Sequence, residues 1–124
     1  GDDTNQLLTA IVDGMREEHT NTVRLAAAQA LLNSLVFTRH NFEVDDERNM
    51  IMQVVCSATK SSDNRIRVVA FESLARIVSL YYDKLMQYMN VLFTLTVEAI
   101  EREDAEEVAM MAIEFWSTMC EEEM

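Results

Sequence analysis

The side chains that usually carry out catalysis are scattered along this chain. His19 and His40 fall in predicted turns and have no neighbouring cysteine or serine with which to form a nucleophile and base pair. Cys56 and Cys120 lie far apart, each in an apolar helical pattern, without a C-x-x-C motif or a histidine cluster. We interpret the histidines as exposed turn residues and the cysteines as buried, reduced thiols.

Carboxylates are abundant, but their positions have a structural explanation. Asp45, Asp46 and Glu47 open a predicted helix, as do the acids between residues 103 and 107, and the helix dipole favours negative charge there. The run at residues 121–123 is typical of a solvated surface. The chain has no glycine-rich phosphate loop, no H-E-x-x-H motif and no calcium-binding loop. We therefore expect no enzyme activity, no metal site and no cofactor.

Apolar grooves are the more promising kind of site. Met50, Met52, Met86 and Met89 gather on the first helices of successive predicted pairs (the A helices) rather than on the alanine-rich second helices (the B helices). Methionine fills gaps in cores and is also common at adaptable binding surfaces, so both roles stay open. Grooves between neighbouring A helices would suit short apolar anchors separated by polar spacers.

The repeat spacing locates two such grooves. For the first groove, we expect one wall to consist of Leu8, Thr9 and Val12 and the other wall to consist of Glu47, Met50 and Ile51. One repeat further on, a second groove would place Ile51, Met52 and Val55 opposite Met89, Leu92 and Phe93. The alternative for both sets is that these residues form the core between repeats.

Six helices must position these residues. Apolar side chains at i, i+3 and i+4 spacing predict helices at about 4–18, 22–37, 45–58, 64–82, 83–102 and 103–119. The segment from Thr38 to Phe42 is polar with one apolar anchor, and residues 61–64 form a capping cluster. Because the chain has no proline and only two glycines, little interrupts the helices. The sequence predicts one all-α unit over residues 1–124.

The predicted helices recur in pairs about 43 residues apart. The shared frame is a β-branched residue, an alanine and a large apolar residue, at Val23/Ala27/Leu31, Ile66/Ala70/Leu74 and Val108/Ala112/Trp116. This period indicates an α-solenoid of about three repeats, at about 4–37, 44–82 and 83–121, with six antiparallel helices in A/B pairs. Because apolar residues reach both ends of the sequence, we expect a longer array of repeats.

The net charge of −12 argues against nucleic-acid binding, because phosphates require clustered basic residues. The charge favours a basic partner, or it serves solubility alone. No stretch has the length and apolar character of a membrane span, the first residues do not resemble a signal peptide, and no N-glycosylation motif occurs. These features predict a soluble protein of the cytosol or nucleus with no membrane partner.

Several runs are more specific than the repeat frame. The segments 30–35 (ALLNSL), 51–56 (IMQVVC) and 79–82 (SLYY), together with 8–11, 25–27 and 113–117, strongly resemble the importin-β (karyopherin-β) family of nuclear import receptors. The resemblance covers essentially the whole chain and corresponds to about three HEAT repeats from the amino-terminal half of the family. It implies a right-handed HEAT superhelix with A helices outside and B helices inside.

The resemblance also implies a ligand for the first groove. In this family, outer A-helix grooves of this segment bind phenylalanines of FG-repeat nucleoporins during nuclear import. Carried over to this sequence, the principal groove consists of Leu8, Thr9, Val12, Glu47, Met50 and Ile51. Met50 stands where the family usually has phenylalanine, so the groove stays apolar with a different shape.

The family has further partners, mostly bound by elements outside this segment. They are Ran-GTP, the importin-α adaptor with its basic binding domain, and basic cargo. The resemblance implies a location in the cytoplasm, the nucleus and the pore complexes of the nuclear envelope. The alternative is a HEAT-repeat scaffold of another system, of the phosphatase or chromosome-organising type, which would not need an open apolar cleft between A helices.

Overall fold

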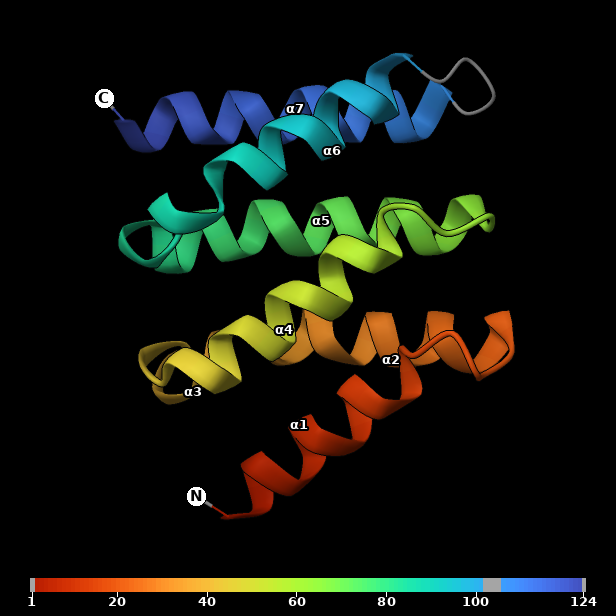
Figure 1. The fold of residues 1–124 in the computed structure, drawn as a ribbon, viewed down its shortest axis with the longest axis vertical. Coiled ribbons are helices and arrows are strands. Elements are labelled where there is room, and N and C mark those ends of the chain that lie inside the picture. Colours follow the sequence, from red (N-terminus) through yellow and green to blue (C-terminus); the bar gives the residue numbers. More distant parts are fainter. Residues whose placement is uncertain (1, 102–105, 124) are drawn as a thin grey trace.

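A computed structural model describes residues 2–101 and 106–123, and over these residues it contains helices and no strands (Figure 1). The α-helices are α1 (Asp2–Gly14), α2 (Asn21–Ser34), α3 (Arg39–Glu43), α4 (Asp45–Ala58), α5 (Asn64–Tyr81), α6 (Met89–Glu101) and α7 (Glu106–Glu123). The short 3-10 helices are η1 (Leu35–Phe37), η2 (Tyr82–Lys84) and η3 (Met86–Tyr88). None of the described helices is long and apolar enough to cross a membrane.

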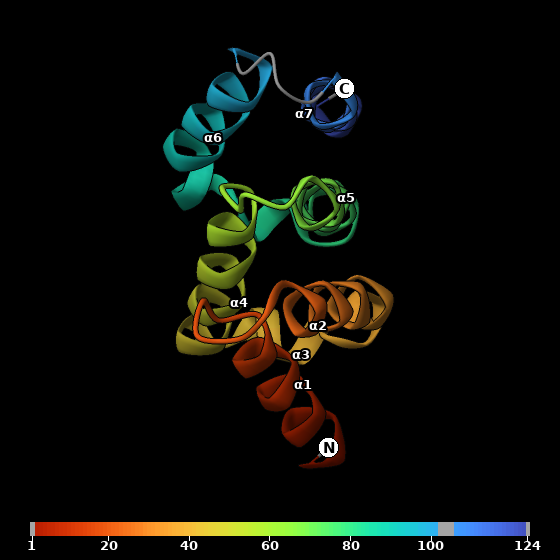
Figure 2. The same cartoon turned by 90° about the vertical axis from the view of Figure 1, so that its right-hand side faces the viewer.

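The long helices form two layers. The B helices α2, α5 and α7 lie side by side in one layer, and the A helices α1, α4 and α6 cross them obliquely in the other (Figures 1 and 2). Within each repeat, α1 packs on α2, α4 on α5 and α6 on α7. The predicted all-α solenoid of A/B helix pairs is confirmed.

The recurring sequence frame packs the B helices together. Ile66 and Ala70 of α5 are fully buried, as are Val108 and Ala112 of α7, and α5 contacts both α2 and α7. The small alanine side chains let neighbouring helix backbones approach closely. In the first repeat the β-branched position differs, because Val23 is exposed.

The first A helix is shorter than the predicted helix at 4–18, because α1 ends at Gly14. A Cβ atom on Gly14 would lie 3.0 Å from the Cβ of Ala27, which belongs to the facing helix α2. Glycine therefore permits the close approach of α1 to α2 at the point where the chain turns. Residues 15–19 form that turn.

The structure contains a one-turn helix, α3, where the sequence predicted only a polar segment. It buries Asn41 and Phe42 completely, although Arg39 and His40 beside them are exposed. The ring of Phe42 stacks on Tyr81, with 4.4 Å between ring centroids and 13° between planes, and the Tyr81 hydroxyl donates a hydrogen bond to the carbonyl of Leu35. The link between the first and second repeats thus has its own small core.

The predicted helix at 83–102 also begins differently, because α6 starts only at Met89. Before it, the N–H of Leu85 donates to the carbonyl of Tyr82 (3.1 Å) and the N–H of Tyr88 to the carbonyl of Leu85 (2.9 Å). These tighter 3-10 turns bury Leu85 and bring the Tyr88 hydroxyl to 3.3 Å from Nε of Arg48 on α4.

Two side-chain caps fix the starts of B helices. The hydroxyl of Thr20 accepts a hydrogen bond from the N–H of Val23 (3.3 Å), and the carboxylate of Asp63 accepts one from the N–H of Arg65 (2.9 Å). The Arg65 guanidinium also donates to Asp63 (2.8 Å), and this pairing holds the pKa of the Asp63 carboxyl below its ordinary value.

Phe42→Ala tests whether α3 anchors the fold. Removing a fully buried, stacked ring should lower the free energy of unfolding by about 3–5 kcal/mol. Tyr81→Phe keeps the stacked ring and removes the hydroxyl with its hydrogen bonds to Leu35 and Thr38, so it should cost only about 1–2 kcal/mol. Urea denaturation followed by circular dichroism measures both. Equal losses in the two variants would contradict the importance of ring packing.

Candidate binding grooves on the outer helices

All six residues predicted for the first groove line one cavity between α1 and α4. The cavity has a volume of about 80 Å³, and its lining residues are Asn5, Leu8, Thr9, Val12, Asn41, Glu47, Met50 and Ile51. The residues of α1 recur at i, i+3, i+4 and i+7, so they share one face of that helix. The two walls predicted from repeat spacing therefore face each other in the structure.

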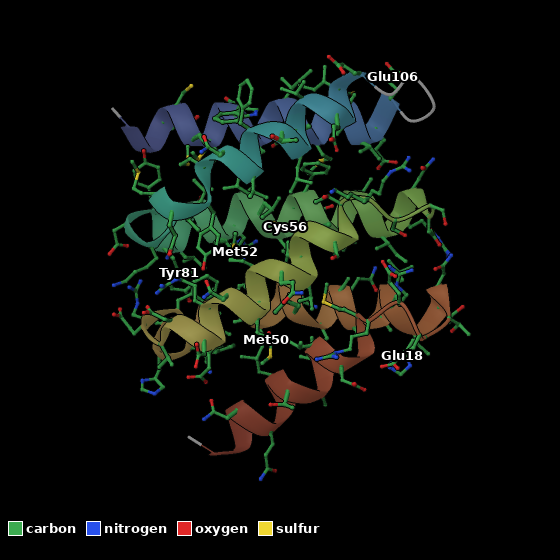
Figure 3. All side chains as sticks on the ribbon, in the orientation of Figure 1. Glu18, Met50, Met52, Cys56, Tyr81 and Glu106 are labelled. Carbon is green, nitrogen blue, oxygen red and sulfur yellow. The ribbon has the colours of Figure 1, made fainter. Side chains whose placement is uncertain are left out.

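The floor of this first groove is apolar and its accessible wall is Met50. Leu8, Val12 and Ile51 are buried, whereas Met50 keeps 44% of its surface exposed and Thr9 is exposed. Figure 3 shows Met50 on the side of α4 that faces α1. The exposed thioether is the adaptable part of the groove, because methionine has three side-chain torsions and no branch.

The polar rim of the first groove is held by Asn41, which sequence reasoning missed. Its side-chain amide nitrogen donates to Oδ1 of Asn5 (2.9 Å) and to Oε1 of Glu47 (3.0 Å). Asn41 is only 2% exposed and comes from α3, so one side chain joins α1 to α4 across the end of the groove. The polar segment around Asn41 gave no periodic signal by which to place it.

A second, larger cavity lies between α4 and α6. It has a volume of about 400 Å³ and is lined by Asn49, Met52, Gln53, Cys56, Ser57, Lys60, Tyr88, Val91 and Leu95. Figure 3 places Met52 and Cys56 on the side of α4 opposite Met50. The two cavities thus open on the two sides of the same A helix.

The structure brings together only part of the second predicted set. Met52 lines the cavity, but Val55 and Leu92 are fully buried in the core and Met89 packs against that core. Phe93 is 58% exposed and meets Trp116 edge to face, with 6.1 Å between ring centroids. The cavity instead faces the stripes of α4 and α6 next to the predicted ones. On α4 its lining residues recur at i, i+3, i+4 and i+7 (Asn49, Met52, Gln53 and Cys56), and on α6 Val91 and Leu95 stand at i and i+4. That spacing is the signal that could have identified them.

Hydrogen bonds fix Tyr88 at one end of the second cavity. Its hydroxyl donates to Oδ1 of Asn49 and accepts from Nε of Arg48 (3.3 Å). Arg48 is itself buried, and it also donates to the carbonyl of Phe42 (2.8 Å) and to Oδ1 of Asp45 (2.7 Å). The end wall of this cavity is therefore tied to α3 and to the start of α4.

Cys56 lines the second cavity as an unreactive thiol. Burial away from water raises its pKa to about 11, although the charge of Lys60 acts in the opposite direction. Cys120 on α7 is exposed, contrary to the prediction that both cysteines are buried. The predicted reduced state is consistent with both thiols being free in the structure.

The grooves have the chemistry of binding surfaces. Each has an apolar lining with amide, hydroxyl or single charged groups at its edge, and these groups suit a short apolar anchor flanked by a polar chain. Among the described residues, one group of possible metal ligands occurs, formed by Asp13, Glu18 and His19 in and beside the turn after α1. His40 is exposed on α3.

Comparison with curated proteins finds relatives that align with nearly the whole chain. Importin subunit beta-1 of Arabidopsis thaliana is 52% identical over 97% of this chain. The chain spans 14% of the length of that relative. A family model described as the Vacuolar 14 Fab1-binding region matches residues 36–115.

Solved structures give the same relationship in three dimensions. Kap95, which is yeast importin-β, is 44% identical in a Kap95:Nup1 complex, with a TM-score of 0.92 over 98% of this chain and 14% of that chain. Kap95p in a study of its binding to RanGDP is 45% identical, with a TM-score of 0.88 over 94% of this chain and 14% of that chain.

Cysteine labelling tests the environment of the second cavity. With pKa about 11, only about one Cys56 thiol in ten thousand is ionised at pH 7, and the thiolate is the reactive form. In Cys120→Ser, labelling by a disulfide reagent should therefore be slow at pH 7 and accelerate about tenfold per pH unit up to about pH 10. In Cys56→Ser, the exposed Cys120 should react quickly at pH 7. Similar rates at pH 7 would contradict the burial of Cys56.

Asn41→Ala tests the bridge across the first groove. The change leaves the amide oxygen of Asn5 and the carboxylate of Glu47 without their shared donor, so it should lower the free energy of unfolding by about 1–3 kcal/mol. Asn5→Ala is the matched control, because it removes one bond at an exposed position and should cost less than about 1 kcal/mol. Urea denaturation compares them, and equal effects would count against the bridge.

Proposed function

The chain belongs to the importin-β family, and on this premise we propose that it is a segment of a nuclear transport receptor. Its residues 36–115 also belong to the family described as the Vacuolar 14 Fab1-binding region. Its outer A-helix grooves bind phenylalanine side chains of FG-repeat nucleoporins. The observation that carries this proposal is that all six residues implied by the family resemblance line one apolar cavity between α1 and α4.

The size of the first groove indicates how a phenylalanine enters it. A cavity of about 150 Å³ is known to hold benzene, and the first groove has about 80 Å³. The ring therefore fits only if Met50 moves aside, which its exposure and its flexible side chain allow. Burial of one phenylalanine contributes about 1.5–3 kcal/mol, before the cost of ordering the peptide, so each contact is weak.

The second groove adds another site of the same kind. Its volume of about 400 Å³ holds a phenyl ring without rearrangement, and Met52, Val91 and Leu95 supply apolar walls. Asn49 and Gln53 at the edge are suited to hydrogen bonds with a peptide backbone. Two weak sites on one receptor increase the overall affinity for a multivalent chain while each contact still exchanges rapidly.

The wider biology follows from the family. The related Kap95 forms a complex with Nup1 and binds RanGDP, so the whole receptor containing this segment interacts with nucleoporins and Ran. It carries basic cargo, directly or through the importin-α adaptor, between cytoplasm and nucleus through pore complexes of the nuclear envelope. The acidic charge of this segment favours basic partners. The role is binding rather than catalysis.

Titration with an FG-repeat peptide, followed by NMR amide and methionine methyl shifts, tests this function. Ile51 is 1% exposed, so Ile51→Asp would bury a charge and risk unfolding. Met50→Glu is sharper, because this half-exposed position tolerates a charge while the carboxylate makes the first groove polar. We expect the peptide to shift residues 8–12 and 47–51 in the unmodified chain and to bind that groove at least about tenfold more weakly in Met50→Glu.

Matched variants separate the two grooves. Val91→Glu introduces the same charge at a half-exposed wall of the second cavity and should remove only the shifts around residues 49–60. Met110→Glu, at an exposed position on α7 in the other layer, should leave both sets unchanged. Circular dichroism checks that every variant is folded. Peptide shifts that avoid both grooves would favour the structural scaffold instead.

A further inference from the structure

A third cavity continues the first groove toward the end of α1. It has a volume of about 370 Å³ and is lined by Met15, Arg16, Glu17, Glu18, Met50, Gln53, Val54 and Ser57. Met50 lines both this cavity and the first groove. We call the first groove and the third cavity, which meet at the Met50 side chain, the α1–α4 trough. The third cavity also meets the second cavity, because Gln53 and Ser57 line both.

The two parts of the trough differ in chemistry. The first is closed by the Asn41 bridge and has an apolar floor. The third cavity keeps apolar surface at Met15 and Val54, and it adds the exposed carboxylates of Glu17 and Glu18. An aromatic side chain suits the first part, whereas the second part suits a side chain with an apolar stem and a polar end.

The charge at the outer end of the third cavity is negative. Ligand atoms of Asp13, Glu18 and His19 all lie within 4.8 Å of one another, and Nε2 of His19 is 3.4 Å from Oδ2 of Asp13. Two carboxylates this close repel each other unless a cation lies nearby. Arg16 also lines the cavity, so its two lining carboxylates, Glu17 and Glu18, outnumber its one fixed cation, and Asp13 adds a further acid beside Glu18.

We propose that the third cavity is a second subsite of the α1–α4 trough, which binds a lysine or arginine close in sequence to the phenylalanine anchored in the first groove. The inference rests on the proposed function. Charge complementarity and continuity of the trough argue for this occupant. The stem of the basic side chain packs on Met15 and Val54, and its charged end meets the carboxylates of Glu17 and Glu18.

The length of the trough sets the spacing between the two peptide residues. From Leu8 to Gly14, where the helix ends, α1 rises about 9 Å at about 1.5 Å per residue, and Met15 follows directly. An extended peptide covers this distance in about three residues at about 3.3 Å each. The basic residue should therefore stand three or four positions from the phenylalanine, and the subsite would select a subset of FG sequences by a neighbouring charge.

Binding of matched peptides to the 124-residue chain tests the subsite. Each peptide carries one phenylalanine, with lysine or glutamine three or four positions before or after it. With the lysine on one side of the phenylalanine, either before or after it, the lysine peptide should bind about two- to fivefold more tightly than its glutamine counterpart at low ionic strength. This difference in affinity should shrink at high salt. Glu17→Gln with Glu18→Gln should abolish the difference between the lysine and glutamine peptides.

A charge-matched control separates the subsite from the general acidity of the chain. Glu114→Gln with Glu121→Gln removes two exposed charges from α7 and should preserve the preference for lysine. Equal loss in both double variants would overturn the proposal. So would equal binding of the lysine and glutamine peptides.

Two further outcomes are informative. If Zn²⁺ shifts the resonances of Glu18 and His19 while the lysine peptide does not, the acidic group belongs to a metal ion and the proposal is wrong. If both peptides bind equally and Met50→Glu still abolishes their binding, the subsite fails but the nucleoporin groove stands. If neither peptide binds near Met50, the proposed function itself fails.

Discussion

Close packing of the B helices determines where the outer grooves form. Buried alanines on α5 and α7 let the backbones of the inner layer approach, and the long helices α2, α5 and α7 stay side by side along their length. The A helices lie on this layer obliquely, so consecutive A helices contact each other only locally (Figures 1 and 2). The spaces between them are a consequence of that crossing, and side chains on α1, α4 and α6 decide whether each space is filled.

Polar links keep these spaces from closing or widening. Asn41 joins α1 to α4 in the first groove, and Arg48 ties Tyr88 to the start of α4 at the second. Both links depend on α3, because it supplies Asn41 directly and the Phe42 carbonyl accepts from Arg48. Since buried polar groups are costly without partners, these bonds favour one spacing of the A helices over others. A five-residue helix thus controls both grooves.

Sequence reasoning succeeded where periodicity carried the information. The helix pairs and the lining of the first groove follow from spacing, because residues that recur at helical intervals must share a face. It failed for α3, whose buried residues Asn41 and Phe42 contact α1, α4 and α5 and show no period of their own. It also failed for most of the second groove, because Val55 and Cys56 are neighbours in sequence but face the core and the cavity respectively. Apolar type alone cannot distinguish those two faces.

The empty volume of the first groove sets the scale of what a ligand gains there. Unfilled space in a core costs roughly 24 cal/mol per Å³, so about 80 Å³ corresponds to at most about 2 kcal/mol, and less because this groove is open to water. That value matches the stabilisation expected from burying one phenylalanine, about 1.5–3 kcal/mol. The binding free energy gained by filling the groove is therefore of the same size as the free energy lost by leaving it empty. Because the Met50 side chain must move when a ligand enters, the first groove alone supports only weak binding. Binding strong enough to slow release would require additional contacts along the trough.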